Sequence, residues 1–229
     1  MAFWGDLVHA ELYKLLKRKT LALCLAFVLA IEMINGFLHG GDQIKTMTLL
    51  MEIIGLITCA LFAGLFVCTD FSSRTIYHIL TSGKSRVCVW LGKYLAYFAA
   101  CFVLLLVNVL AANISLLLFR SDQLALSDLA WQFVLGYSTA GVIYDLCLVS
   151  LFFLIAMQIK ESGLTIAIAV VLVGLMVANS QLLWTDRLLP VLAPQANFQS
   201  IPISNFLLLW LLPGLAALMG IGLFKRCRL

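Results

Sequence analysis

Charge is scarce along this sequence, and proline is scarcer still. Only 11% of its 229 residues are charged, four are proline, and 63% are hydrophobic. Soluble domains are about half apolar and about a quarter charged, so this composition excludes a soluble globular protein. No polar stretch of even about 50 residues is available for a separate soluble domain. The composition therefore predicts an all-α integral membrane protein with a single domain over residues 1–229.

Motifs for catalysis, metal binding and disulfide formation are also missing. The chain has no HExxH, no GxSxG and no CxxC, and His9, His39 and His78 lie in three different segments. The seven cysteines lie in the apolar runs, at their inner ends or in the C-terminal tail, as small apolar fillers. We therefore expect a protein that is not an enzyme and that has no cofactor or metal of its own.

A Gly-Lys-Ser tripeptide at residues 83–85 resembles the end of a phosphate-binding loop. That motif has another glycine at the position of His78, and a β-strand comes before it. Here the upstream residues belong to an apolar run and its exit. Without the glycine-rich turn, backbone N–H groups cannot surround phosphates, so we do not expect this chain to bind ATP. The net charge of +4 is too modest to indicate nucleic-acid binding.

Apolar runs long enough to cross a bilayer, about 20 residues each, dominate the chain. The sequence predicts six spans, at 20–38, 47–68, 94–119, 131–158, 164–183 and 205–224. Twelve of the fifteen basic residues then lie in the inner segments, and only Lys45, Arg120 and Arg187 lie outside. The positive-inside rule therefore predicts that both termini are cytoplasmic.

Residues 1–19 have the pattern of an amphipathic helix at the membrane surface. Apolar side chains, Leu16 among them, recur at helical spacing on one face, and Asp6 and Tyr13 lie opposite. Such a helix lies among lipid headgroups, with its lysines facing anionic lipid. An ordinary flank of the first span is the alternative. The residues that define this interfacial helix are Trp4, Val8, Leu12, Lys14, Leu15, Lys17 and Arg18.

Residues 184–204 form the longest expected outer segment. They contain Pro190, Pro194 and Pro202, together with apolar runs that a fully solvated loop does not need. A hairpin of short helices that dips back into the outer leaflet explains both features, because protein or water satisfies the broken backbone there. A plain proline-rich loop is the alternative.

Three acidic residues lie inside the expected spans. Glu32 and Glu52 belong to the outer parts of the first and second spans, and Asp145 lies near the middle of the fourth. A carboxylate in hydrocarbon costs several kcal/mol unless it faces a cavity, finds a partner or is protonated. These acids are candidates for a substrate path. For Asp145 a hydrogen bond between helices is the alternative, and for the glutamates hydration is favoured. No basic residue lies at membrane depth, which argues against a proton relay.

The longest polar interruption in the first half of the chain separates the second and third spans, from Asp70 to Lys93. Within residues 70–86, apolar side chains share one helical face, and basic and polar side chains lie on the other. Ser72 or Ser73 is suited to cap the start of a short helix, and Gly83 to end it. The sequence therefore predicts a cytoplasmic helix whose polar side contacts a partner. An interfacial loop that only obeys the charge rule is the alternative.

This segment resembles the equivalent stretch of ABC-2 type permeases. The pattern is an acid after the second span, then F-S-S-R-T-I-x-x-I-L-T-S-G-K-S-R, then a lysine and an aromatic residue that open the third span. Arg74 stands where that family commonly has glycine. The positions that match are Asp70, Thr75, Leu80, Ser85, Arg86 and Lys93.

The small size and the missing ATPase domain resemble permease subunits of bacterial exporters for antimicrobial peptides, bacteriocins and their immunity systems. The resemblance implies that two permeases, identical or related, pair in the bacterial plasma membrane. It also implies that separate ABC ATPase subunits, which hold ATP and Mg, dock below and push on the central segment. The ATPase-coupling residues that it implies are Asp70, Ser73, Arg74, Thr75, His78, Leu80, Lys84 and Arg86.

The expected spans give one indication of the transported substrate. They offer no strongly charged cavity, which favours an amphipathic or hydrophobic substrate such as a peptide, a bacteriocin or a lipid-like molecule. Two other functions stay open. One is a non-transporting immunity or sensor protein that binds a toxic peptide or lipid. The other is an ATP-independent carrier or channel, although carriers are often built from internal repeats and the two halves of this chain show no convincing similarity.

Overall fold

The computed structural model describes most of the first 119 residues and a second block around the fifth expected span. All regular secondary structure in these residues is helical. Among these described residues, three helices are long and apolar enough to cross a membrane: Lys19–Leu38, Ile53–Ser72 and Arg86–Ser115. The described part of the chain is thus a helical membrane protein. It comprises residues 2–17, 19–38, 44–73, 75–81, 83, 85–119, 142, 145–146, 148–180, 214–215 and 218–222.

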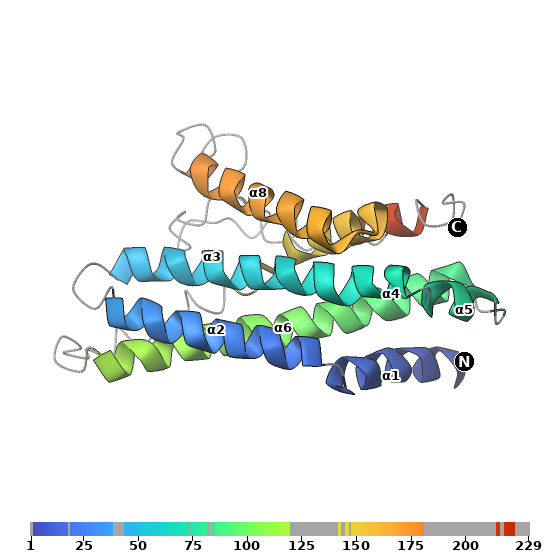
Figure 1. The fold of residues 1–229 in the computed structure, drawn as a ribbon, viewed down its shortest axis with the longest axis horizontal. Helices are drawn as coiled ribbons and strands as arrows, with labels where there is room; N and C mark the ends of the chain where they lie inside the picture. The colour runs from blue at the N-terminus through green and yellow to red at the C-terminus, as the bar shows by residue number, and fades with distance from the viewer. Residues whose placement is uncertain are drawn as a thin grey trace.

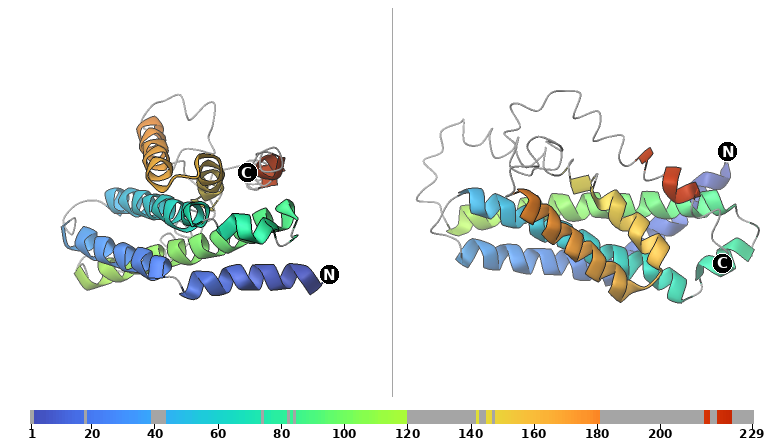
Figure 2. Two further views of the ribbon diagram at one scale, coloured as in Figure 1. Left: turned by 45° about the vertical axis from the view of Figure 1, so that its right-hand side comes forward. Right: turned by 90° about the horizontal axis from the view of Figure 1, so that it is seen from above.

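Three long helices form the centre of the fold. α2 (Lys19–Leu38), α3 (Ile44–Ala63) and α6 (Arg86–Phe119) lie side by side, as Figures 1 and 2 show. α8 (Ser162–Ser180) packs on the side of α3 that is turned away from α2. Their apolar composition leaves large side chains of α2, α6 and α8 exposed on the outside of the bundle, which is expected of helices in lipid.

The shorter helices gather at one end of this bundle. α3 continues through the π-helical η1 (Gly64–Cys68) into the single turn α4 (Thr69–Ser72). α5 (Thr75–Thr81) follows and lies beside the first turns of α6. α1 (Ala2–Lys17) lies at the same end, beyond the start of α2, and packs against α6 (Figure 1). Segments from three parts of the chain therefore meet here.

Aromatic side chains fill the core near that end. The ring of Phe153, in the helical segment Leu148–Ile159, contacts the rings of Trp90, Tyr94 and Tyr97 at centroid distances of 5.2 to 5.3 Å. Such aromatic pairs add about 0.5–1.5 kcal/mol each to the area that they bury. They attach the fourth expected span firmly to the first half of α6.

A glycine allows α8 to approach η1 closely. A Cβ atom on Gly64 would lie 2.5 Å from Cγ1 of Ile166 and 3.0 Å from the backbone oxygen of Ser162. About one turn of helix beyond it, Cys68 Sγ lies 3.3 Å from Thr165 Oγ1. The start of α8 thus packs directly on the π-helical turn, because the small residue at position 64 lets the two helices approach closely.

The boundaries of the expected spans hold only in part. α6 begins at Arg86 rather than near Tyr94, so the last residues of the central polar segment are helical. Ser85 provides the cap, because its Oγ accepts a hydrogen bond from the N–H of Cys88 at 3.3 Å. The outer hairpin at 184–204 lies outside the described residues, as do most of the fourth span before Leu148 and most of the sixth. The count of six spans and the cytoplasmic termini stay predictions.

Candidate functional site

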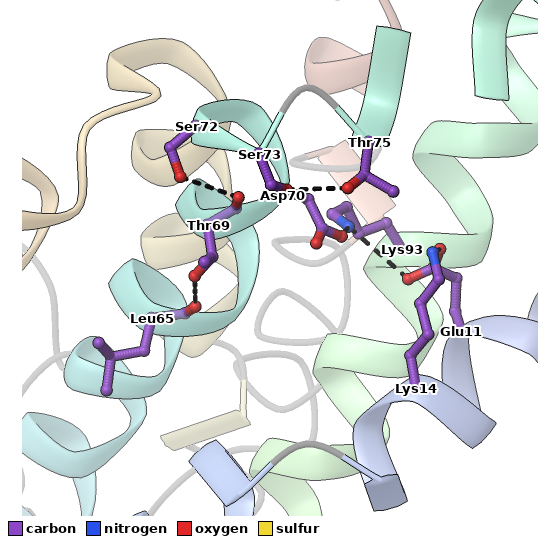
Figure 3. Close-up of polar contacts among 9 residues, drawn as sticks. All are labelled: Glu11, Lys14, Leu65, Thr69, Asp70, Ser72, Ser73, Thr75 and Lys93. Carbon is purple, nitrogen blue, oxygen red and sulfur yellow. Dashed lines mark hydrogen bonds and ion pairs between the residues drawn. The ribbon is translucent and has the colours of Figure 1, made fainter. Parts of the chain in front are cut away.

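The central feature of the crowded end is a set of charged side chains enclosed between helices. Lys93 lies two turns inside α6, and its Nζ forms an ion pair with Oδ2 of Asp70 in α4. The same Nζ lies 3.6 Å from Oε2 of Glu11 in α1, and Oε1 of Glu11 accepts a hydrogen bond of 2.7 Å from Lys14. Figure 3 shows these four side chains pointing toward one another. We call Glu11, Lys14, Asp70 and Lys93 the Lys93 cluster.

Three members of this cluster are almost completely buried. Asp70 is 1% exposed, Lys93 is 2% exposed and Glu11 is 4% exposed. Charges removed from water in this way are strongly destabilising unless they are paired, and deleting one partner of such a pair typically costs about 3–5 kcal/mol. The Lys93 ammonium also lies 5.3 Å from the ring centre of Phe66, which adds a favourable cation–π contact. The cluster therefore holds α1, α4 and α6 together only as long as it stays complete.

The helix expected in the central segment is present as α5. Ile76 is buried against the bundle, whereas Thr81 at the end of the helix is exposed. Ser73 Oγ and Thr75 Oγ1 share a hydrogen bond of 2.8 Å just before the helix (Figure 3). Gly83 has a φ of 84°, the left-handed conformation that suits the expected helix end. The short helix thus turns its apolar side inward.

The polar side of the same segment faces outward where the structure describes it. Ser73, Ser85 and Arg86 are exposed. Arg74 and Lys84 lie outside the described residues, as do the side chains of His78 and Leu80. Asp70 differs from the other expected contact residues, because it is buried in the Lys93 cluster and does not offer its carboxylate to a partner.

α1 is helical as expected, but only part of its apolar face packs against the bundle. Leu15 is buried and Leu12 half-buried, whereas Leu16 is 79% exposed. Successive helical residues are turned by about 100°, so Leu16 falls beside the stripe that ends at Leu15. Glu11 takes its place on the inward face. Of the other expected residues, Lys14 joins the Lys93 cluster and Lys17 is exposed; Arg18 and the side chains of Trp4 and Val8 lie outside the description.

The turn between the fourth and fifth expected spans reaches the same site. Lys160 lies over the ring of Phe71 at 5.6 Å from its centre. Cys68, two residues before Asp70, donates its thiol to the backbone oxygen of Ala156 at 3.6 Å. A movement of α4 would therefore displace this turn as well as α1 and α6.

The acids at membrane depth lie apart from the cluster. Glu32 is 1% exposed, so its expected hydration is wrong: α3 and α6 cover that face of α2. Asp145 is buried and engaged in an interaction, which leaves both a path and a helix contact open for it. The side chain of Glu52 lies outside the description. These three residues are not brought together into one site by the described contacts.

Sequence reasoning passed over Glu11 and gave Lys93 no role beyond the family pattern. The available signal was position: Glu11 shares a helical face with Leu15, so an acid lies in the apolar stripe of this helix. A buried acid in such a stripe needs a cation, and Lys93 is the basic residue closest to the start of the third apolar run. The pairing itself requires the fold.

Comparisons with known proteins do not add to this picture. No model of a known protein family matches the chain, and no curated protein matches it significantly. Any function must therefore be argued from the residues of the central segment and from the geometry around the Lys93 cluster.

Proposed function

We propose that this chain is the membrane-spanning permease subunit of an ABC exporter. It moves an amphipathic or hydrophobic substrate, such as a peptide or a lipid-like molecule, with ATP hydrolysed by a separate subunit. The observation that carries the proposal is the Lys93 cluster, which lies directly behind an outward-facing short helix and connects it to a membrane-long helix. The pattern of residues 70–93 that resembles ABC-2 type permeases supports the same function.

The cluster explains how a push on α5 becomes a movement of the bundle. Only two residues connect α4 to α5, and Asp70 of α4 is paired with Lys93 of α6. Glu11 connects the same lysine to α1. Because separating buried charges is costly, the three helices respond to a force as one body. A docked ATPase that changes shape on hydrolysis would thereby tilt α6 and reposition α1.

The π-helical turn gives this body a place to bend. η1 lies directly before α4 and interrupts the regular hydrogen bonding of the long helix. Single π-turns of this kind inside α-helices occur frequently at functional sites. The start of α8 rests on η1 through Gly64, so bending there would move the fifth expected span relative to α3.

Co-purification with an ATPase tests the proposal. The native protein should leave the membrane with an ABC ATPase, and the reconstituted complex should show substrate-stimulated ATP hydrolysis. Reversing the exposed charge with Arg86→Glu should weaken ATPase association about tenfold, the effect of about 1.4 kcal/mol. Arg74→Glu should do the same. Lys19→Glu is the matched control, since Lys19 is an exposed basic residue at the start of α2.

Two results would contradict the proposal. One is a native protein that is never accompanied by an ATPase subunit. The other is full transport by the Arg74→Glu/Arg86→Glu double variant. Protection of cells from a toxic peptide while ATP hydrolysis is blocked would instead identify a non-transporting immunity protein.

A further inference from the structure

A second set of buried polar side chains lies between α2, α3 and α6, at the end of the bundle remote from the Lys93 cluster. Glu32 and Asn35 come from α2, and Asn108 and Ser115 come from α6. All four are buried, with Glu32 at 1% and Asn108 at 2% exposure. We call these four residues the Glu32 seam. Polar groups this well enclosed between apolar helices need partners within the protein.

The register of the helices places Glu32 near Asn108. α2 and α6 run parallel, because the preceding α1 meets the first turns of α6 while the ring of Phe37 contacts that of Phe119 at 5.8 Å. A Cβ on Gly36 would lie 2.7 Å from Cβ of Ser115, so Gly36 and Ser115 lie at the same height along the two helix axes. From there Glu32 lies about 6 Å back along α2, and Asn108 lies about 10 Å back along α6. The two residues are therefore offset by about one turn.

The hydrogen bonds of the seam leave two acceptor atoms unused. Asn108 Nδ2 donates to the backbone oxygen of Met51 in α3 at 2.8 Å, and the Asn35 side chain bonds the Glu32 carboxyl. Within the part of the chain that the structure describes, however, Oε1 of Glu32 and Oδ1 of Asn108 have no hydrogen-bond partner. The described residues of this buried seam therefore leave two acceptor oxygens without a donor. A proton on the carboxyl would turn one of these acceptors into a donor.

The charged side chains that the structure describes on the neighbouring helices do not supply that donor. α6 has no charged residue after Lys93, and α1 lies at the other end of the bundle. On α3 the charged residues are Lys45 and Glu52, whose side chains lie outside the description. No described basic side chain forms an ion pair with Glu32, in contrast to Glu11 and Asp70, which share Lys93.

We propose that Glu32 is a proton-binding site within the membrane-spanning bundle. While α2, α3 and α6 are packed as they are here, the carboxyl is neutral and keeps one proton taken from water. When the helices separate and water reaches the seam, the carboxyl returns the proton to water and becomes a carboxylate. The site is a single proton acceptor and not a relay, because no chain of titratable groups leads away from it among the residues that the structure describes. The inference does not depend on ATP-driven transport.

Infrared spectroscopy of the purified protein in lipid tests this site. At about pH 7 the wild-type spectrum should show the carbonyl stretch of a protonated carboxyl, and carbon-13 labelling of the glutamate carboxyls should shift it. Free glutamates ionise near pH 4.3, so an unburied acid gives no such band. Glu32→Gln should remove the band. Glu52→Gln, which changes the acid of the second expected span, is the matched control and should keep it.

Thermal unfolding provides a second reading. Folding takes up a proton at Glu32, so the melting temperature of the wild type should fall as the pH is raised from about 5 to about 9, and Glu32→Gln should lose this part of the dependence. If Glu32→Gln fails to fold, the carbon-13 shift in the wild type and in Glu52→Gln still decides the matter.

Three results would overturn the proposal. The first is the absence of a glutamate-derived band from the wild type, and the second is its loss in Glu52→Gln alone. The third is a rise of the wild-type melting temperature with sodium or potassium at fixed pH that Glu32→Gln does not show, because the seam would then hold a metal cation instead of a proton.

Discussion

Asp70 and Lys93 form a buried ion pair that ties together the two ends of the central polar segment. They lie 23 residues apart, one in the turn that ends the α3–η1–α4 helix and the other two turns inside α6. α5 and Gly83 belong to the segment of chain between them. Because a buried ion pair joins the two ends of this segment, a force on α5 is passed to both α4 and α6.

Replacing Lys93 by methionine should destabilise the protein strongly. The change keeps most of the side-chain volume but leaves Asp70 and Glu11 as buried carboxylates without their shared cation. We expect a loss of about 3–5 kcal/mol, seen as a large drop in melting temperature in lipid nanodiscs. Adding Asp70→Asn and Glu11→Gln to Lys93→Met should recover most of the loss. A triple variant no more stable than Lys93→Met would show that lost packing, and not unpaired charge, is responsible.

Glu11→Gln should loosen α1 without unfolding the bundle. Lys93 keeps Asp70 as its partner, so we expect a smaller loss than for Lys93→Met, about 1–3 kcal/mol for weakening one buried polar contact. Amide hydrogen exchange should become faster in α1 and stay unchanged in α2 and α3. Lys14→Ala is the control: its side chain is partly exposed and one turn from Glu11, and such pairs contribute about 1 kcal/mol at most. Equal acceleration in both variants would show that Lys93 does not hold α1.

The sequence was sufficient for the class of fold, because apolar runs of membrane length need no tertiary information. It was also sufficient for α5 and its inward Ile76, since the face of a short helix follows from spacing alone. It was not sufficient to tell which of Leu16 and Glu11 in α1 faces the bundle. Both lie at the edge of the same helical stripe, and apolarity favours Leu16, but the choice depends on Lys93 from a distant helix. Hydropathy carries no information about such long-range pairs.

The predicted start of the third span was wrong for a related physical reason. Lys93 and Arg86 are charged, so hydropathy places the start of the third span after them, yet α6 starts at Arg86. The helix continues because Ser85 caps it and the Lys93 cluster neutralises the charge inside. Glu32 was misjudged in the opposite sense: its position near a span end suggests water, but α6 covers it.

Gly64→Ala should weaken the contact of α8 with η1. The added methyl group would overlap Ile166 and press on the backbone of Ser162, which cannot rotate away. We expect a loss of about 1–3 kcal/mol, typical of overpacking, measured as a lower melting temperature. Gly174→Ala on α8 is the matched control, since nothing lies within 4 Å of the added atom there. Ile166→Ala should rescue Gly64→Ala only in part, because the backbone contact remains; full stability of Gly64→Ala alone would contradict the close approach.

Cysteine labelling should separate the exposed end of α6 from the core and report which side of the membrane it faces. Cys88 is partly exposed near the start of α6, whereas Cys59 is fully buried between α3 and α6. In variants with a single cysteine, a membrane-impermeant maleimide should therefore modify Cys88 in inverted vesicles and leave it unmodified in intact cells. Cys59 should react in neither preparation until the protein is denatured. Because twelve of the fifteen basic residues fall on the side assigned to the cytoplasm, modification of Cys88 from outside intact cells would reverse the topology and remove the basis for ATPase docking at α5.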